Sequence, residues 1–99
     1  MRKLIVGIRD LASHKYHGIC VEDSEYSACR SFSSSCLSSK AKKEGLLWTH
    51  GADFELRVLG EIDIETGEVF PLPKGSEFLM DGSVYMMGFA DDELESEGD

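Results

Sequence analysis

Hydrophobic and polar residues alternate along residues 54–64. Apolar side chains stand at every second position, with Gly60 at the one gap: Phe54, Leu56, Val58, Ile62 and Ile64. A β-strand places residues two apart on the same face, whereas a helix would scatter them around its axis. We therefore expect a strand that turns these five side chains to the core and turns the intervening charged side chains to water, namely Glu55, Arg57, Glu61 and Asp63.

The residues that follow predict a hairpin. Gly67 can adopt a positive φ without steric cost, so the chain can turn at residues 65–67 and return along residues 68–70. Pro71 and Pro73 end the returning strand, because proline has no N–H to donate to a ladder.

The first half of the chain predicts two further strands. Residues 3–9 are rich in β-branched side chains, and their contiguous apolar centre is typical of a central strand. We expect a surface loop over residues 10–18 and a short strand over residues 19–21.

One main helix is predicted between Glu22 and Gly45. Asp23 or Ser24 can cap its first turn, and Gly45 can end it. Apolar residues then recur at the three- and four-residue spacings of one helical face: Ala28, Cys29, Phe32 and Cys36. Residues 31–39 include six serines, which compete for the backbone hydrogen bonds, so the last turns are expected to fray.

The remaining segments complete the fold prediction. Residues 46–50 are apolar enough to be buried or to form a short strand, and residues 78–87 predict two short strands around an Asp81-Gly82 turn. We expect a single α+β domain over residues 1–90. It has an antiparallel sheet of four to five strands with one main helix packed on one face, in the order β-β-α-β-β. Since the other face and the sheet edges stay open, we also expect a homo-oligomer.

Charge divides the chain. Residues 1–50 hold eight Lys and Arg against five Asp and Glu, a net charge of +3, whereas residues 51–99 hold two against fourteen, a net charge of −12. Six of these acids fall in the last nine residues. With a single large apolar residue, residues 91–99 are expected to form a disordered acidic tail, which could cover a basic patch until a partner displaces it.

Catalytic, metal-binding and membrane-spanning patterns are missing from the sequence. It has no glycine-rich phosphate loop, GxSxG or HExxH motif, so we expect no enzyme and no cofactor. The spacing His14-x-x-His17-x-x-Cys20 matches no common zinc site, and we expect no metal. The three cysteines include no CxxC pair and are expected to be buried small hydrophobes. No run of about 18 apolar residues exists to cross a membrane.

Nucleic-acid binding and protein interaction are the two open function classes. Basic residues cluster in the first half near Tyr16 and Trp48, where they could hold phosphates and stack bases. The candidate nucleic-acid-binding residues are Arg9, Lys15, Arg30, Lys40, Lys42, Lys43 and Trp48. Alternatively, the three lysines complement a helix end and Trp48 belongs to the core. A small core and open sheet edges equally suit a protein-interaction module.

Several motifs taken in order suggest a family. They are Ile8-Arg9-Asp10, Arg30-Ser31-Phe32, Asp53-Phe54-Glu55-Leu56, Leu59-Gly60, Asp63 and Thr66-Gly67. Together they resemble the small non-structural protein of gokushovirus-type microviruses (Microviridae), which are single-stranded DNA phages. The resemblance covers about residues 4–73.

The resemblance implies a non-enzymatic, DNA-binding viral protein that assists single-stranded genome synthesis or packaging in the cytoplasm of the bacterial host. It transfers no residue beyond Arg9 and Arg30, which either contact DNA or brace Asp10 and Asp53 in the fold. The acidity of this chain departs from the family pattern. We therefore weigh a single-stranded DNA-binding phage accessory protein against a module that acts on phage or host proteins without touching DNA.

Overall fold

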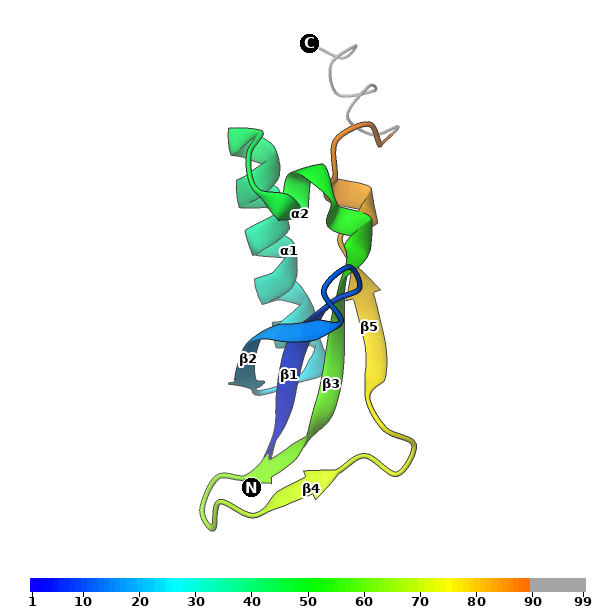
Figure 1. Ribbon diagram of the computed structural model, residues 1–99. Coiled ribbons are helices and arrows are strands. Elements are labelled where there is room, and N and C mark those ends of the chain that lie inside the picture. The colour runs from blue at the N-terminus through cyan, green and yellow to red at the C-terminus, as the bar shows by residue number, and fades with distance from the viewer. Residues whose placement is uncertain (90–99) are drawn as a thin grey trace.

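The computed structural model describes residues 1–89. In this part of the chain an antiparallel sheet of five strands carries one long helix, which confirms the predicted α+β fold (Figure 1). The elements, in chain order, are β1 (Arg2–Asp10), β2 (Lys15–Glu22), α1 (Glu25–Lys42), α2 (Leu46–Thr49), β3 (Phe54–Asp63), β4 (Val69–Pro71) and β5 (Glu77–Asp81). Single 3-10 turns lie at Gly51–Asp53 and Ser83–Tyr85. The predicted tail, residues 91–99, lies outside the described residues.

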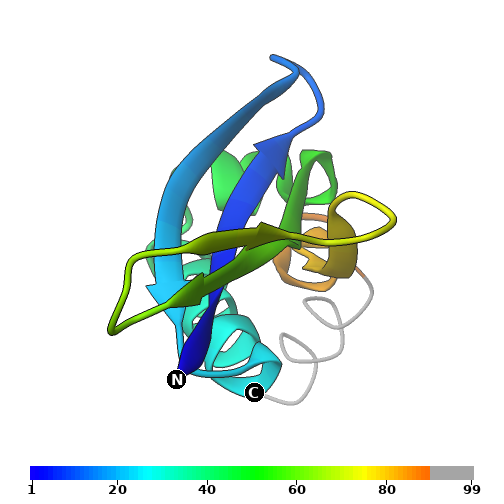
Figure 2. The ribbon, with the colours of Figure 1, turned by 90° about the horizontal axis from the view of Figure 1, so that it is seen from below.

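The strand order is β2-β1-β3-β4, and β5 also pairs with β3. β1 is central, as the sequence predicts, because it pairs along its length with both β2 and β3. β4 and β5 pair with successive stretches of β3, at residues 60–62 and 55–58. Figure 2 shows β2, β1 and β3 side by side, with β4 crossing in front of them at the C-terminal end of β3.

The helix begins as the sequence predicts and ends earlier. The Ser24 hydroxyl accepts from the backbone N–H of Ser27, and the Ser24 backbone N–H donates to the Ser27 hydroxyl, which together form a capping box. Lys43, with φ 53°, adopts the left-handed conformation at the end of the helix, two residues before Gly45, which we expected to end it. The serine-rich turns stay helical up to Lys42, so the expectation that they fray is wrong.

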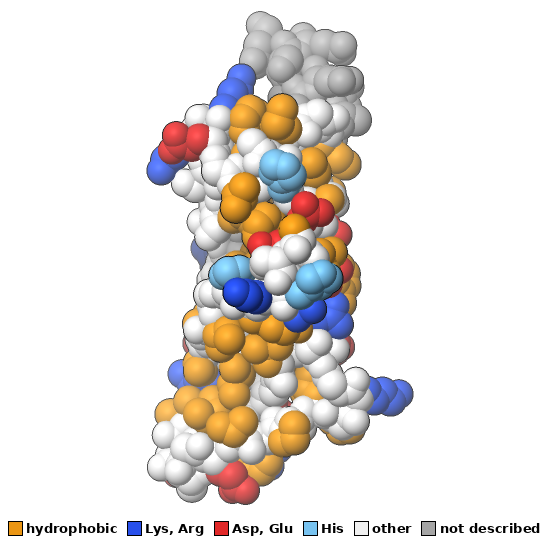
Figure 3. All heavy atoms as spheres, in the orientation of Figure 1, with side chains coloured by type: hydrophobic (Ala, Val, Ile, Leu, Met, Phe, Trp, Pro, Cys, Tyr) orange, Lys and Arg blue, Asp and Glu red, His pale blue; other side chains and the backbone are white. Residues whose placement is uncertain are grey.

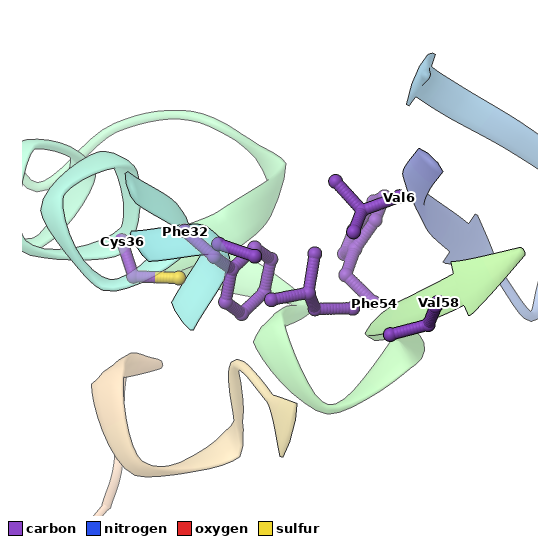
Figure 4. Packing of buried hydrophobic residues seen from close by; sticks show 7 residues of the cluster. Val6, Phe32, Cys36, Phe54 and Val58 are labelled. Carbon is purple, nitrogen blue, oxygen red and sulfur yellow. The ribbon is translucent and has the colours of Figure 1, made fainter. Parts of the chain in front are cut away.

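The core lies between α1 and one face of the sheet. Its buried hydrophobic residues are Val6, Ala28, Phe32, Cys36, Phe54, Leu56 and Val58 (Figure 4). Phe32 and Cys36 point from α1 toward the sheet, so the predicted apolar face of the helix is confirmed. The prediction for β3 holds only as far as Val58, because Ile62 is half-buried and Ile64 is 49% exposed.

A β-bulge explains why the alternation in β3 fails. Val58 lies opposite Val6 and Gly60 lies opposite Ile5, so Leu59 is an extra residue on β3. Beyond it, Ile62 lies opposite Lys3 rather than Leu4 and moves to the face away from α1. An unbroken period of two in the sequence does not reveal this extra residue.

The predicted loop over residues 10–18 is mostly strand. The chain turns at residues 11–14, where the Asp10 carboxylate accepts from the backbone N–H of Ala12 and of Ser13, and β2 starts at Lys15. Burial raises the pKa of Asp10, but the hydrogen bonds from Ser13 and Ala12 outweigh it and hold that pKa below its usual value. Polar side chains do not prevent pairing here, because β1 supplies backbone partners along the whole segment.

Two predictions for the second half are wrong. Residues 46–49, which we expected to be buried or to form a short strand, form the short helix α2 and include no buried residue. The chain after Asp81 enters a 3-10 turn instead of a second strand. A close backbone contact fixes the chain where the 3-10 turn begins: the Gly82 N–H donates to the carbonyl oxygens of Gly51 and Phe54 at 3.1 and 3.2 Å. A Cβ on Gly51 would collide with the Gly82 carbonyl. Within residues 1–89 no helix has the length and apolarity needed to cross a bilayer.

Candidate nucleic-acid interface

The sheet has a second face, which α1 does not cover. We call it the open face. Val6 and Ile8 of β1 point to α1, so the alternate residues Ile5, Gly7 and Arg9 point to the open face. Directly paired residues share a face. The partners of these positions on the neighbouring strands are therefore also on the open face: Tyr16, Val21, Glu55 and Arg57.

Charged and aromatic groups meet at one end of the open face. The Arg9 guanidinium lies 5.3 Å from the centre of the Tyr16 ring, and the Tyr16 hydroxyl lies 3.2 Å from Ser76 Oγ. Arg57 donates from Nε to the same Ser76 oxygen at 2.9 Å. We call Arg9, Tyr16, Arg57 and Ser76 the arginine–tyrosine cluster. With Leu11 and Glu55 it lines a shallow depression of about 330 Å³.

Gly7 makes room for this arrangement. A Cβ at Gly7 would lie 3.2 Å from side-chain atoms of each of Tyr16, Ile19 and Leu59. These three side chains therefore lie across the bare backbone of β1. The missing side chain at Gly7 lets the Tyr16 ring reach over the sheet toward Arg57 and Ser76.

The two arginines of the cluster differ in what they already bind. Arg57 is held on several sides: NH1 donates to Glu55 Oε1 at 3.0 Å and NH2 donates to the Ser76 carbonyl oxygen at 3.1 Å. Its side chain is 23% exposed, so the expectation that Arg57 points into water is wrong. Arg9 makes no ion pair with any carboxylate in residues 1–89. Its guanidinium therefore keeps donors for an anionic ligand above the Tyr16 ring.

The predicted lysines and Trp48 lie elsewhere. Lys42 and Lys43 are exposed at the end of α1, where cations stabilise the carbonyl end of the helix. Lys40 is half-buried in the last turn. Trp48 is half-buried in α2, and its carbonyl accepts from the Met87 N–H at 2.7 Å. α2 and the end of α1 lie together at one end of the molecule (Figure 1), whereas Arg9 lies in the sheet.

The remaining two predicted residues are separate again. Arg30 is exposed on α1, and Lys15 is exposed at the start of β2, opposite Asp10. The structure thus distributes the seven predicted residues over several places and joins only Arg9 to an aromatic ring. The residues that complete its surroundings, Arg57 and Ser76, were missed.

A sequence signal for Arg57 exists but depends on pairing. Arg57 alternates with the core residues Leu56 and Val58, so it is on the face away from the helix. Only the antiparallel pairing of β1 with β3 brings it near Arg9, and Ser76 arrives from the loop after β4. No local pattern contains that information.

The cysteines divide into different environments. Cys36 is fully buried, and burial raises its pKa to about 11, which keeps the thiol protonated and unreactive. Cys29 is half-buried, whereas Cys20 on β2 is exposed, so the expectation of three buried cysteines is wrong for Cys20.

Hydrophobic side chains continue the open face away from the cluster. Ile19 is 59% exposed, Val21 46% and Val69 58%. In the orientation of Figure 3, hydrophobic side chains gather over the lower half of the molecule, below a group of Lys, Arg and His side chains. The open face therefore combines a basic, aromatic end with an apolar end.

Comparison with known proteins identifies a family. Residues 3–85 match a family model described as Phage ORF5 protein. No curated protein and no solved structure matches the chain.

Proposed function

The chain belongs to the Phage ORF5 protein family, and on that premise we propose that it is a non-enzymatic accessory protein that binds single-stranded DNA during phage genome synthesis or packaging. The observation that carries the proposal is the arginine–tyrosine cluster on the open face. Its Tyr16 ring lies 5.3 Å from the guanidinium of Arg9, which makes no ion pair within residues 1–89.

The cluster has the two kinds of group that single-stranded DNA requires. An aromatic ring stacks on any unpaired base, and a guanidinium binds a phosphate with two parallel hydrogen bonds. Arg57 is fixed by Ser76 and Glu55, so the floor of the depression is preorganised and binding orders few additional side chains.

The net charge of −9 limits how the protein can bind DNA. At low salt the whole chain repels a polyanion, so attraction must come from close contacts rather than from the overall field. We expect weak binding that depends on salt mainly through Arg9.

The test is fluorescence anisotropy of a labelled single-stranded oligonucleotide at about 50 mM and about 200 mM salt. Replacing Arg9 by Gln removes one phosphate contact and should lower the salt slope by about 0.7. Replacing Tyr16 by Leu removes a stacking surface worth about 1–3 kcal/mol and should weaken binding at both salt concentrations.

Two variants serve as matched controls. Arg30→Gln removes an exposed arginine from α1, and the double variant K42Q/K43Q removes two exposed lysines from the helix end. Both should bind like the wild type if the cluster is the interface. Equal losses in all variants would point to diffuse electrostatic binding, and a loss confined to K42Q/K43Q would move the site to the helix end.

A protein-interaction module is the alternative, favoured by the exposed apolar side chains of Ile19, Val21 and Val69. Such a module acts on phage or host proteins and does not need Arg9. No change in anisotropy at the lower salt concentration, with a folded protein by circular dichroism, would reject DNA binding in favour of this alternative.

A further inference from the structure

β2 is an edge strand with one unpaired side. It pairs with β1 on one side, and no strand in residues 1–89 pairs with its other side. Six of its eight residues are exposed, among them Ile19 and Val21. The helix does not close over it either, since a groove of about 180 Å³ separates Cys20 from Phe32 of α1. An apolar edge of this length is a template for another strand.

The bulge in β2 restricts which strand can fit. Gly7 of β1 lies opposite two residues of β2, Gly18 and Ile19, and Gly18 adopts φ 59°. Such a bulge bends the strand and rejects a regular partner. A second copy of β2 carries the same bulge, so in an antiparallel pair about a two-fold axis the two bulges meet at the centre.

The bulge also selects the register. His17 and Cys20 both point to the α1 side, because they pair with Ile8 and Val6 of β1. Tyr16 and Val21 both point to the open face. Pairing that uses all of β2 therefore sets Tyr16 opposite the partner's Val21 and His17 opposite the partner's Cys20, each on a common face. A shift of the register by one residue would set residues of the α1 side opposite residues of the open face.

The charges of β2 agree with this register. The strand starts at Lys15 and ends at Glu22, so the same pairing sets each lysine opposite a glutamate of the other copy, twice about the axis. Lys15 is exposed, and Glu22 accepts a hydrogen bond from Ser27 through Oε1, which leaves Oε2 for the lysine. We propose that two copies of the chain dimerise through β2 in this register.

The dimer has a clear structural consequence. The sheet continues through both copies, and both open faces lie on the same side, since opposing residues share a face. Two arginine–tyrosine clusters are then presented on one surface. The proposal does not rest on DNA binding, because it uses only the free edge of β2.

Cross-linking tests the register directly. His17→Cys places a thiol opposite the partner's native Cys20, at the Cβ separation of neighbouring strands that a disulfide can close. Oxidised H17C should run as a covalent dimer on a non-reducing gel. The matched controls are H17C/C20S, which lacks the acceptor, and Ser13→Cys, which places a thiol in the exposed turn. Neither control should give that dimer.

Charge reversal tests the same contact without new thiols. Lys15→Glu or Glu22→Lys alone sets like charges opposite each other and should shift the protein toward monomer in sedimentation equilibrium. The double variant K15E/E22K restores opposite charges and should restore the dimer. Circular dichroism checks that each variant folds.

Each outcome decides for or against the proposal. A wild-type monomer at all concentrations overturns it. A dimer that neither single charge variant weakens, or one that S13C captures as well as H17C, places the contact elsewhere and also overturns it. Capture by H17C together with rescue by the double charge variant supports it.

Discussion

The two faces of the sheet use the same strands for different purposes. On the α1 side, Val6, Leu56 and Val58 are 2–3% exposed and pack against Phe32. On the open face, Ile19 and Val21 of β2 are 59% and 46% exposed. Residue type does not explain the difference, since both faces carry β-branched side chains. The presence of a covering helix does.

This comparison separates stability from recognition. Apolar area removed from water stabilises the fold, at roughly 25 cal/mol per Å². Within one chain, only the α1 side of the sheet has most of its apolar area buried. The open face contributes less to folding and keeps its side chains accessible. Changes on the two faces should therefore have different effects.

The largest expected effect is on the helix side. Phe32→Ala leaves a cavity in the core and should cost about 3–5 kcal/mol, a large part of the stability of a chain of this size. The paired change Ile19→Ala on the open face should alter stability by about 0.5 kcal/mol or less. Thermal and urea unfolding followed by circular dichroism measure both. Similar losses for the two variants would contradict the division between faces.

Two glycines sharpen the comparison. A Cβ at Gly60 would lie 2.7 Å from the Phe70 carbonyl oxygen, a backbone atom of β4. Gly60→Ala should therefore push β4 away from β3 and cost about 1–3 kcal/mol.

At Gly7 the obstacles are side-chain atoms of the open face, each 3.2 Å away, rather than a backbone carbonyl. Gly7→Ala should cost less than Gly60→Ala in urea unfolding and should disturb the Tyr16 ring instead, with a change in DNA affinity. A larger loss of stability for Gly7→Ala would show that the open face is as tightly packed as the core.

Low pH should destabilise the turn between β3 and β4, which contains Asp63. The Glu65 N–H donates to Asp63 Oδ1 at 2.9 Å, and this bond, with a smaller one from Thr66, holds the pKa of Asp63 below its usual value of 3.8. Because the pKa of Asp63 is lower in the folded than in the unfolded state, its carboxylate stabilises the fold at pH values above the unfolded-state pKa. This contribution to the free energy of unfolding is lost as the pH falls through the folded-state pKa.

Asp63→Asn keeps an acceptor and removes the titration. Its unfolding midpoint should therefore change less than that of the wild type between about pH 6 and about pH 3. An identical pH dependence would show that the turn does not contribute to acid sensitivity.

Thiol labelling is the mildest probe, because it leaves the fold intact. Cys20 is exposed on β2 and should react with a maleimide first, Cys29 later, and buried Cys36 only on unfolding. Mass spectrometry of partly labelled protein gives the order. Slow labelling of Cys20 that becomes fast on dilution would agree with a covered β2 edge.

The fold was largely predictable because its signals are local. Alternation marked β3, the apolar spacing from Ala28 to Cys36 marked α1, and Gly67 marked the turn before β4. Each is a short-range preference that tertiary contacts reinforce. The prediction for residues 83–85 was wrong where the chain depends on a long-range contact, because Gly82, just before them, packs its backbone against Gly51. The helix at residues 46–49 was also not predicted.

The candidate site was predictable only in part. Arg9 and Tyr16 lie on paired strands and were noticed for charge and aromaticity, but their pairing was not foreseen because β2 begins four residues earlier than predicted. The lysines at the end of α1 were predicted to bind DNA because of their charge. Lysines that only stabilise the carbonyl end of a helix have the same sequence pattern, so composition cannot separate the two roles.

By itself the sequence determined the kinds of element, the central place of β1 and the uneven distribution of charge, since these follow from side-chain periodicity and composition. The tertiary structure alone decided which side chains share a face. Extra residues at Leu59 and at Gly18–Ile19 shift the strands against one another, and a shift of one residue reverses every side chain beyond it. Whether a strand contains a bulge residue depends on its pairing with another strand that is distant in the sequence. The periodicity of a single strand therefore cannot show where Arg9, Tyr16 and Arg57 meet.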